Sequence, residues 1–348
     1  MKTTRALALL GAAAIATLAA PPILGALARP KPPIIEAPPP PPPPPGPVSL
    51  PAHTLADAAA YQAWLERAGA VSPAFVDGPS VAKALKDTTA ASPDAIIRDA
   101  VALGAVAALQ DQGFVGEIRN AGTSPENRDL MVRYLMADAR YALIFKGSDH
   151  AAGLAQQAIG APALKLYLNA RAIKQASYDI QHQDWSKQDV TDRPTRLAMV
   201  EQAGKVSLND AADHVDALRA ASTGGTPMSV AAAPLAPPYT PLVAESLQLA
   251  AIAALGLASD DMYDRLAALA GDDRDTKPCL HEAKLNLYQC LAVAKPHYED
   301  IFCMGQHAMS DTAACLVTNA GLSLPPEPPP PPPPPTPVKK KVPVHRKT

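Results

Sequence analysis

Ser80 and Lys83 are the residues whose types and spacing come closest to a catalytic pattern. They form an S-x-x-K sequence, in which the lysine follows the serine by one helical turn and can help to activate its hydroxyl as a nucleophile. Ser207 and Asn209 could supply the S-x-N element that accompanies this pattern, but no K-T-G sequence follows. The chemistry would be that of a cell-wall-active hydrolase or acyltransferase. The alternative is a serine that caps a helix and a lysine on its surface.

Four cysteines, all in the last segment of the chain, are the next candidates for chemistry. Because the residue before a proline avoids the α region, Pro296 marks a break between two helices. Folding the chain at this break places Cys290 opposite Cys303. It also places Cys279 opposite Cys315. The spacing therefore predicts a helical hairpin closed by two nested disulfides.

A zinc site is the alternative for the same segment. Cys303 and His307 are one helical turn apart, and His281 and His297 are nearby, so ligands that zinc prefers are present. However, the close cysteine pairs of most zinc sites are absent, and an oxidising compartment favours disulfides. We therefore interpret the histidines as surface or hydrogen-bonded residues and predict no metal. No cofactor is predicted either, because the chain lacks Walker, dinucleotide-binding, H-E-x-x-H and haem-attachment motifs.

Trp185 is a candidate for binding a partner. It lies with His182 and Asp184 in a polar stretch at the end of an expected helix, and the chain has only 2 tryptophans. Tryptophan is among the residues that most often anchor protein interfaces. The alternative is a side chain that covers a small part of the core from a loop.

The C-terminal tail combines a proline run with basic residues. Residues 328–335 are all proline, and such runs form polyproline II helices. The basic side chains that follow are Lys339, Lys340, Lys341, His345, Arg346 and Lys347. They are candidates for binding anionic lipid, lipopolysaccharide or peptidoglycan, and the alternative is a solvated end. Because the whole chain has a net charge of −2, no nucleic-acid partner is predicted.

The N-terminal segment has the features of an export signal. Lys2 and Arg5 precede an uncharged stretch, and residues 26–28 match the small-x-small pattern of a signal-peptidase site. Cleavage after Ala28 would release the protein into the periplasm. Without cleavage, the stretch is long enough to act as a single N-terminal anchor in the inner membrane. Both alternatives predict an exported protein of the cell envelope.

The composition and the helix signals indicate an all-α, multi-helix protein. Only 4% of residues are aromatic, so Ala, Leu, Val and Ile must fill the core, which suits closely packed helices. Ser92 and Ser124 are strong helix starts, because each precedes a proline at the first helical position. No stretch of alternating β-branched residues predicts a sheet. The helices that we expect cover residues 55–68, 78–86, 96–109, 130–145, 149–159, 163–180, 194–203, 208–221, 242–257 and 260–270.

Composition divides the chain into six parts. The two ends are rich in proline, and a stretch rich in glycine, proline and alanine interrupts the helical middle. We expect a signal peptide or signal anchor (1–28), a disordered proline-rich linker (29–52), a helical main body (53–222), a connection (223–241), C-terminal helices with the four-cysteine hairpin (242–322) and a disordered proline-rich basic tail (323–348).

One run of sequence, Ala283 to Cys315, resembles an uncharacterised family of exported bacterial helical proteins with a C-terminal four-cysteine helical hairpin. Residues 75–85, 105–115 and 239–243 are similar to the same family. The resemblance implies a shared fold over most of the domain and carries over no activity, cofactor or catalytic residue. The cysteine layout is also similar to that of coiled-coil–helix modules with twin cysteine pairs, although the spacings here are longer.

Taken together, these features favour a non-enzymatic scaffold or adaptor of the cell envelope. Its helical body would bind a protein or cell-wall partner, and the proline segments would space it from its points of attachment. The first alternative is a hydrolase or acyltransferase that uses Ser80 and Lys83. The second is a carrier that holds a small ligand in an apolar pocket between helices.

Overall fold

Helices make up the regular secondary structure in the part of the chain that the computed structural model describes, residues 44–205, 212–270 and 275–326. Within these ranges no β-strand is present. The all-α prediction is therefore confirmed. The expected signal or anchor segment, residues 1–28, lies outside the described residues, as do the basic residues of the tail.

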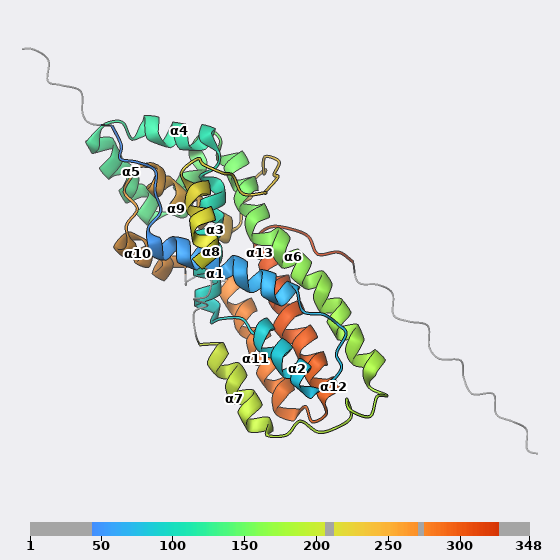
Figure 1. The fold of residues 1–348 in the computed structure, drawn as a ribbon. Helices are drawn as coiled ribbons and strands as arrows, with labels where there is room; N and C mark the ends of the chain where they lie inside the picture. Colours follow the sequence, from blue (N-terminus) through green and yellow to red (C-terminus); the bar gives the residue numbers. More distant parts are fainter. Residues whose placement is uncertain (1–43, 206–211, 271–274, 327–348) are drawn as a thin grey trace, which may run out of the picture. The chain divides into compact units, whose positions relative to one another are not determined.

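Several of the helices drawn in Figure 1 begin at residues that the sequence predicts as caps. Ser92 accepts a hydrogen bond from the Ala95 N–H, and Ser124 accepts one from the Asn127 N–H. In chain order the elements are α1 (Ala52–Gly69), α2 (Gly78–Thr88), α3 (Pro93–Ala108), α4 (Gln112–Ala121), α5 (Pro125–Ala137), the 3-10 helix η1 (Ala139–Ile144), α6 (Ser148–Ile180), α7 (Arg193–Ala203), α8 (Ala212–Ser222), α9 (Pro241–Ala254), α10 (Asp260–Ala270), α11 (Thr276–Val293), α12 (His297–Cys303), the π-helix η2 (Met304–Asp311) and α13 (Thr312–Asn319).

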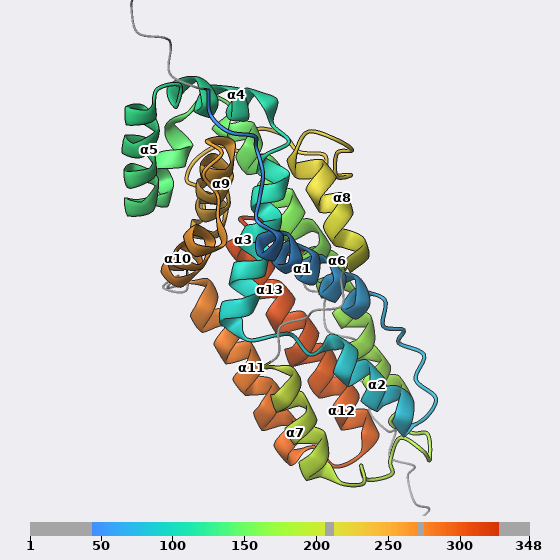
Figure 2. The same ribbon diagram turned by 60° about the vertical axis from the view of Figure 1, so that its left-hand side comes forward.

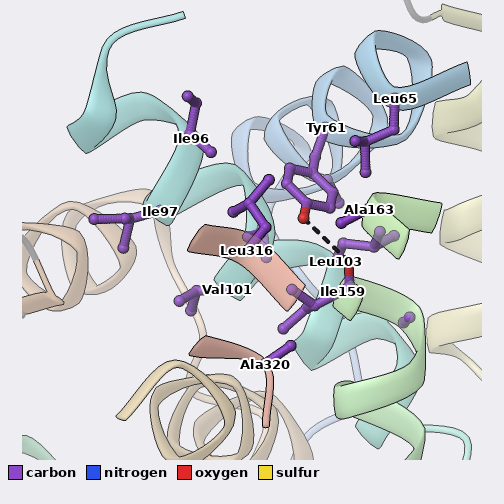
Figure 3. Close-up of a cluster of buried hydrophobic side chains, with 14 of the residues drawn as sticks. Tyr61, Leu65, Ile96, Ile97, Val101, Leu103, Ile159, Ala163, Leu316 and Ala320 are labelled. Atoms are coloured by element: carbon purple, nitrogen blue, oxygen red, sulfur yellow. Dashed lines mark hydrogen bonds between the residues drawn. The ribbon is translucent and has the colours of Figure 1, made fainter. Parts of the chain in front are cut away.

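The core lies where α3 packs against α1, α6 and α9 (Figure 2). α3 is buried on nearly every side, as its uniformly apolar sequence predicts. Figure 3 shows Leu103 of α3 near Ile159 of α6 and Tyr61 of α1, whose hydroxyl donates a hydrogen bond to the Ile159 carbonyl over 3.1 Å. Small residues let these helices approach closely, since a Cβ on Gly104 would lie 2.3 Å from the Ser246 hydroxyl of α9.

The longest helix, α6, corrects a prediction. The sequence predicts two helices over residues 149–159 and 163–180, whereas the structure has one helix of 33 residues with Pro162 inside it. A proline removes one backbone hydrogen bond and favours a break. α6 packs against α1 and α3 and also against α12, η2 and α13, and these tertiary contacts hold both halves in one helix.

Two other boundaries also differ from the prediction. The helix expected over residues 130–145 ends at Ala137, and η1 follows. The reason is Asp138, whose extended backbone ends α5 and whose side chain accepts a hydrogen bond from the Arg140 N–H over 2.9 Å. No helix is predicted over α4, which begins after Asp111, a residue that caps it through the Phe114 N–H.

The C-terminal helices form the predicted disulfide-closed hairpin. The chain reverses between α11 and α12 at Pro296. A disulfide joins Cys290 to Cys303 with a Cα–Cα distance of 5.6 Å. A second disulfide joins Cys279 to Cys315 with a Cα–Cα distance of 5.8 Å. Both predicted pairings are therefore confirmed.

The helix α9 is apolar on almost every side and packs against α3, α6 and η1. A helix of this kind is typical of a protein core or of a membrane span. Measured over the described residues, however, none of the helices combines the length and the apolar composition that crossing a bilayer requires.

Candidate functional site

Ser80 and Lys83 are each engaged with an aspartate. The Ser80 N–H donates to the Asp77 carboxylate over 2.8 Å, and the Ser80 hydroxyl donates to the Asp77 carbonyl over 2.7 Å. The Asp77 N–H donates to the Ser80 hydroxyl over 3.3 Å, which completes a capping box at the start of α2. The Lys83 ammonium pairs with Asp87 over 2.5 Å on the exposed face of the same helix. This arrangement is that of a capping serine and a surface lysine.

A cavity of about 640 Å³ lies where α2, α7, α12 and the loop between α6 and α7 meet. In Figure 2 these helices lie side by side at one end of the C-terminal hairpin. The size is within the range of ligand-binding pockets. The polar and aromatic residues that line it include Asp77, Trp185, Asp192, Arg196, His297 and Asp300. We refer to it as the Trp185 pocket.

The two rings of the pocket lie next to each other. Trp185 is half-buried, its ring centroid is 6.3 Å from that of His297, and its Nε1–H donates to the Gln183 side chain over 2.5 Å. α2 approaches His297 closely, because a Cβ on Gly78 would lie 2.5 Å from the imidazole ring. The residue predicted as a partner-binding anchor therefore lies in a concave site and forms one of its walls.

The loop that carries Trp185 is fixed to the disulfide-closed turn. The Val190 N–H donates to the Lys295 carbonyl over 2.8 Å. The His297 N–H donates to the Gln188 carbonyl, and the Tyr298 N–H donates to the Ser186 carbonyl, both over 3.2 Å. The Cys290–Cys303 disulfide closes the turn that supplies one side of these bonds. The pocket is therefore formed before any partner arrives.

A buried ion pair contributes to the lining of the pocket. The Arg196 guanidinium pairs with Asp300 over 2.5 Å, and their side chains are 7% and 3% exposed. Arg196 also donates to the Leu291 carbonyl on α11. Burial raises the pKa of the Asp300 carboxyl to about 6, although Arg196 opposes this shift. Burial and the neighbouring Arg196 lower the pKa of His297, so its imidazole is neutral at pH 7.

Two further aspartates cap helices at the edge of the pocket. Asp77 caps α2, and Asp192 caps α7 by accepting a hydrogen bond from the Thr195 N–H over 3.4 Å. Asp192 adopts a left-handed backbone conformation with φ of 56°, which is unfavourable for most side chains but more tolerable for aspartate. Such strained positions are frequent at binding sites.

A second, larger cavity of about 960 Å³ lies between α1, α6, α8 and the segment that follows α8. Its floor is mainly apolar and contains Leu65, Leu103, Leu218 and Met228. Its polar rim includes an ion pair between Glu66 and His214 over 3.4 Å. This is the kind of apolar pocket between helices that a small-ligand carrier needs.

The alternative of a zinc site loses its sulfur ligands to the disulfides. His307 contacts Asp311 over 2.7 Å, and His297 lies in the Trp185 pocket. Across the residues that the structure describes, no group of three or more His, Cys, Asp or Glu side chains is placed to hold a metal ion.

The sequence singles out Trp185 but misses the residues around it. Arg196 and Asp300 are 104 positions apart, and nothing in either local sequence indicates that they pair. The available signal is local. Asp77 and Asp192 each stand two residues before a proline, a pattern typical of a helix start, but two helix starts in the sequence do not show that the helices converge. The basic candidates of the tail, Lys339, Lys340, Lys341, Arg346 and Lys347, lie outside the described residues.

Comparison with known proteins adds no assignment to this geometry. No protein-family model, curated protein or solved structure matches the chain.

Proposed function

We propose that this protein is an exported, non-enzymatic adaptor of the cell envelope that binds a protein or cell-wall partner through the Trp185 pocket. One observation carries the proposal. Of the two tryptophans, Trp64 is buried in the core, whereas Trp185 forms a wall of a concave site of about 640 Å³. Tryptophan is among the residues that are enriched where the binding energy of protein interfaces is concentrated.

The rigidity of the pocket supports binding. Its Trp185 loop is joined by three backbone hydrogen bonds to a turn that the Cys290–Cys303 disulfide closes. Ordering a loop on binding costs about 0.5–1.5 kcal/mol for each side chain that is immobilised, and a preformed site avoids most of this cost. The pocket therefore offers a partner a surface that needs little rearrangement.

The ionisable groups of the pocket also fit binding better than catalysis. Asp300 is paired with Arg196, while Asp77 and Asp192 cap helices. The hydroxyl of Ser80, which the hydrolase alternative would use, is engaged in the capping box of α2. These groups hold the site in shape.

The proposed location is the periplasm, with the protein either soluble or tethered to the inner membrane. Residues 1–28 have the pattern of an export signal, which supports this location. Two disulfides are typical of proteins that fold in an oxidising compartment. Membership of the exported bacterial family that residues 283–315 resemble is part of the same proposal.

Candidate partners are an envelope protein, peptidoglycan and an anionic lipid surface. The proline segments would space the body from its attachment points, and the basic tail would add an electrostatic contact that weakens as salt rises. The Trp185 pocket, in contrast, would select the partner by shape and by specific contacts.

Cross-linking in intact envelopes followed by pull-down tests the proposal. Full-length protein, a chain truncated after Pro325, Trp185→Ala and Tyr178→Ala are compared. Tyr178 is a matched control because it is an aromatic residue of α6 that is 47% exposed and lies outside the pocket. We expect the full-length protein, the truncated chain and Tyr178→Ala to capture the same defined partner. Only the Trp185→Ala protein should fail to capture it. Capture that is unaffected by Trp185→Ala, or that depends on the tail alone, would contradict an adaptor whose body does the binding.

A carrier of small apolar ligands is a second candidate function, favoured by the cavity of about 960 Å³ between α1, α6 and α8. Native mass spectrometry of the exported protein should then show a bound small molecule. Ala161 lines the cavity, so Ala161→Phe should fill it and abolish binding of the small molecule. Ala137→Phe, at the exposed end of α5, is the control. A protein that carries no ligand would leave only the adaptor proposal.

A further inference from the structure

The Trp185 pocket has an excess of negative charge. Its lining holds three carboxylates, those of Asp77, Asp192 and Asp300. The guanidinium in the same lining, that of Arg196, is paired with Asp300. Two of the carboxylates cap helices whose dipoles offset about half a charge each, so the side chains of the lining keep a net negative charge. His297 adds no positive charge at neutral pH, since burial lowers its pKa.

The contacts of the capping carboxylates leave room for a cation. Asp77 and Asp192 each use Oδ1 to cap a helix, and the Oδ2 atom of each accepts no hydrogen bond from the described residues. Both lie in the same lining as the Trp185 indole. The face of a tryptophan attracts ammonium and guanidinium groups. A lysine or arginine side chain has the charge and the hydrogen-bond donors that carboxylates and an indole face both attract.

The chain carries a segment with this chemistry beyond its last described residue. Residues 337–348 read PVKKKVPVHRKT and contain three consecutive lysines with prolines on both sides. Extended proline-containing peptides also dock on aromatic side chains, because their conformation is set before binding. The charge of this segment and its proline content therefore make it complementary to the pocket.

The segment can also reach the pocket. The Gly321 carbonyl accepts a hydrogen bond from Gln156 of α6 over 3.0 Å, so the chain leaves the body beside this part of α6 (Figure 1). The loop that carries Trp185 begins at the other end of α6, after Ile180, about 24 residues or roughly 36 Å along the helix. The chain from Pro326 to Lys339 has about 13 residues, and at about 3.1 Å per residue an extended chain of this length can reach roughly 40 Å.

We propose that the Trp185 pocket is a subsite for the cationic side chain of a basic, proline-containing peptide, and that the tail segment 337–348 of this chain is its resident ligand. The inference rests on the proposed function, since the partner of the adaptor would use the same pocket. The tail and the partner of the adaptor would then compete for the pocket. Removing the tail should then increase capture of the partner.

Nuclear magnetic resonance on the exported full chain tests the inference directly. The two tryptophans give two indole N–H signals, which Trp185→Phe assigns. The Trp64 indole donates to the Thr88 carbonyl inside the core and serves as the internal reference. Truncation after Pro325 should shift the Trp185 signal and leave the Trp64 signal in place. Adding a synthetic peptide of residues 337–348 to the truncated chain should return the Trp185 signal to its position in the full chain. The same amount of peptide should have a smaller effect at high salt, because salt screens the attraction between the charges.

Charge-removing variants test the role of the carboxylates. Asp77→Asn and Asp192→Asn together keep both caps, because asparagine caps helices as well as aspartate does and tolerates a left-handed backbone. They should weaken binding of the peptide to the truncated chain about tenfold. Asp129→Asn, an exposed carboxylate of α5, is the matched control and should leave the affinity unchanged.

Three results would overturn the inference. They are a Trp185 signal that is the same with and without the tail, a peptide affinity that the double variant leaves unchanged, and equal restoration by a peptide whose lysines and arginine are replaced by alanine. If capture of the envelope partner still depended on Trp185 in any of these cases, the adaptor proposal would stand and only the tail would be excluded as ligand.

Discussion

At the scale of single residues, aspartates shape the Trp185 pocket. Asp77 and Asp192 cap α2 and α7 and place carboxylates in the lining that also contains Trp185. Asp300 is buried against Arg196 and fixes the position of the guanidinium. Because asparagine can cap a helix but carries no charge, Asp→Asn substitutions separate the structural role of each residue from its electrostatic role.

Ser80→Ala tests the reading of Ser80 as a capping residue. The substitution removes half of a capping box, so we expect the free energy of unfolding to fall by about 0.5–1 kcal/mol in chemical denaturation. Ser124→Ala, at the start of α5, is the matched control and should cost a similar amount. Labelling of the wild-type protein by a penicillin-like probe that disappears in Ser80→Ala would instead support the hydrolase or acyltransferase alternative.

The raised pKa of Asp300 predicts a dependence of stability on pH. Its carboxyl titrates at about 6 in the folded protein, against about 4 in an unfolded chain. Between these values the folded protein holds a proton that the unfolded chain has lost. Its contribution to the free energy of unfolding therefore falls as the pH rises, by up to about 1.4 kcal/mol per pH unit.

Chemical denaturation of wild type and Asp300→Asn from pH 4 to pH 7 measures this contribution. Because asparagine does not titrate, the variant should gain stability relative to wild type as the pH rises from about 4 to about 6. Asp129→Asn, on the exposed face of α5, should show no such trend relative to wild type. A stability difference that is constant over this range would contradict the assignment of a raised pKa to Asp300.

At the scale of elements, the disulfide-closed hairpin positions one side of the pocket. The Cys290–Cys303 disulfide spans 13 residues and brackets His297 and Asp300. The Cys279–Cys315 disulfide spans 36 residues and ties α11 to α13 away from the pocket. The two disulfides therefore differ in their relation to the site, and this difference can be tested.

Replacing each cysteine pair by serine should separate stability from binding. In the chain-entropy model the loss of Cys290–Cys303 costs roughly 3 kcal/mol and the loss of Cys279–Cys315 roughly 4 kcal/mol. We expect only the first variant to lose partner capture that depends on Trp185, when both are assayed under conditions in which they remain folded. Equal loss of capture in both variants would show that the hairpin acts through overall stability.

The helix boundaries could be predicted from the sequence where they depend on neighbouring residues. Serine caps before Pro93 and Pro125 mark α3 and α5 because capping involves neighbouring residues. The disulfide pairing followed from the break at Pro296. Tertiary packing was not predictable: Pro162 suggests a break in α6, but contacts with distant helices keep it continuous. The end of α5 was not predicted, because an aspartate such as Asp138 can occur inside a helix as well as at a capping position.

At the scale of the whole molecule, the proposed function in the envelope requires that the protein is exported. A fusion of residues 1–52 to alkaline phosphatase should be active, since this enzyme needs disulfides that form outside the cytoplasm. A fusion of residues 29–52 alone should be inactive. N-terminal sequencing of the mature protein would show Arg29 if the signal is cleaved and Met1 if it is retained. Inactivity of the first fusion would contradict a location in the envelope.

The site was less predictable than the fold because it joins three separate segments of the chain, residues 77–82, 185–199 and 297–300. Trp185 stood out through its rarity, but Asp77, Arg196 and Asp300 meet it only after α2, α7 and α12 pack together. No periodic pattern in a single sequence encodes contacts over such distances. A binding site that is assembled by packing therefore becomes visible only in the structure.

Site-specific photo-cross-linking in intact cells tests the central claim most directly. A photoreactive phenylalanine analogue is placed at position 185 in one protein and at position 178 in another, since both residues are aromatic and only Trp185 lines the pocket. We predict that position 185 gives a discrete adduct with an envelope partner and that position 178 does not. No adduct at position 185, or the same adducts at both positions, would contradict binding through the Trp185 pocket.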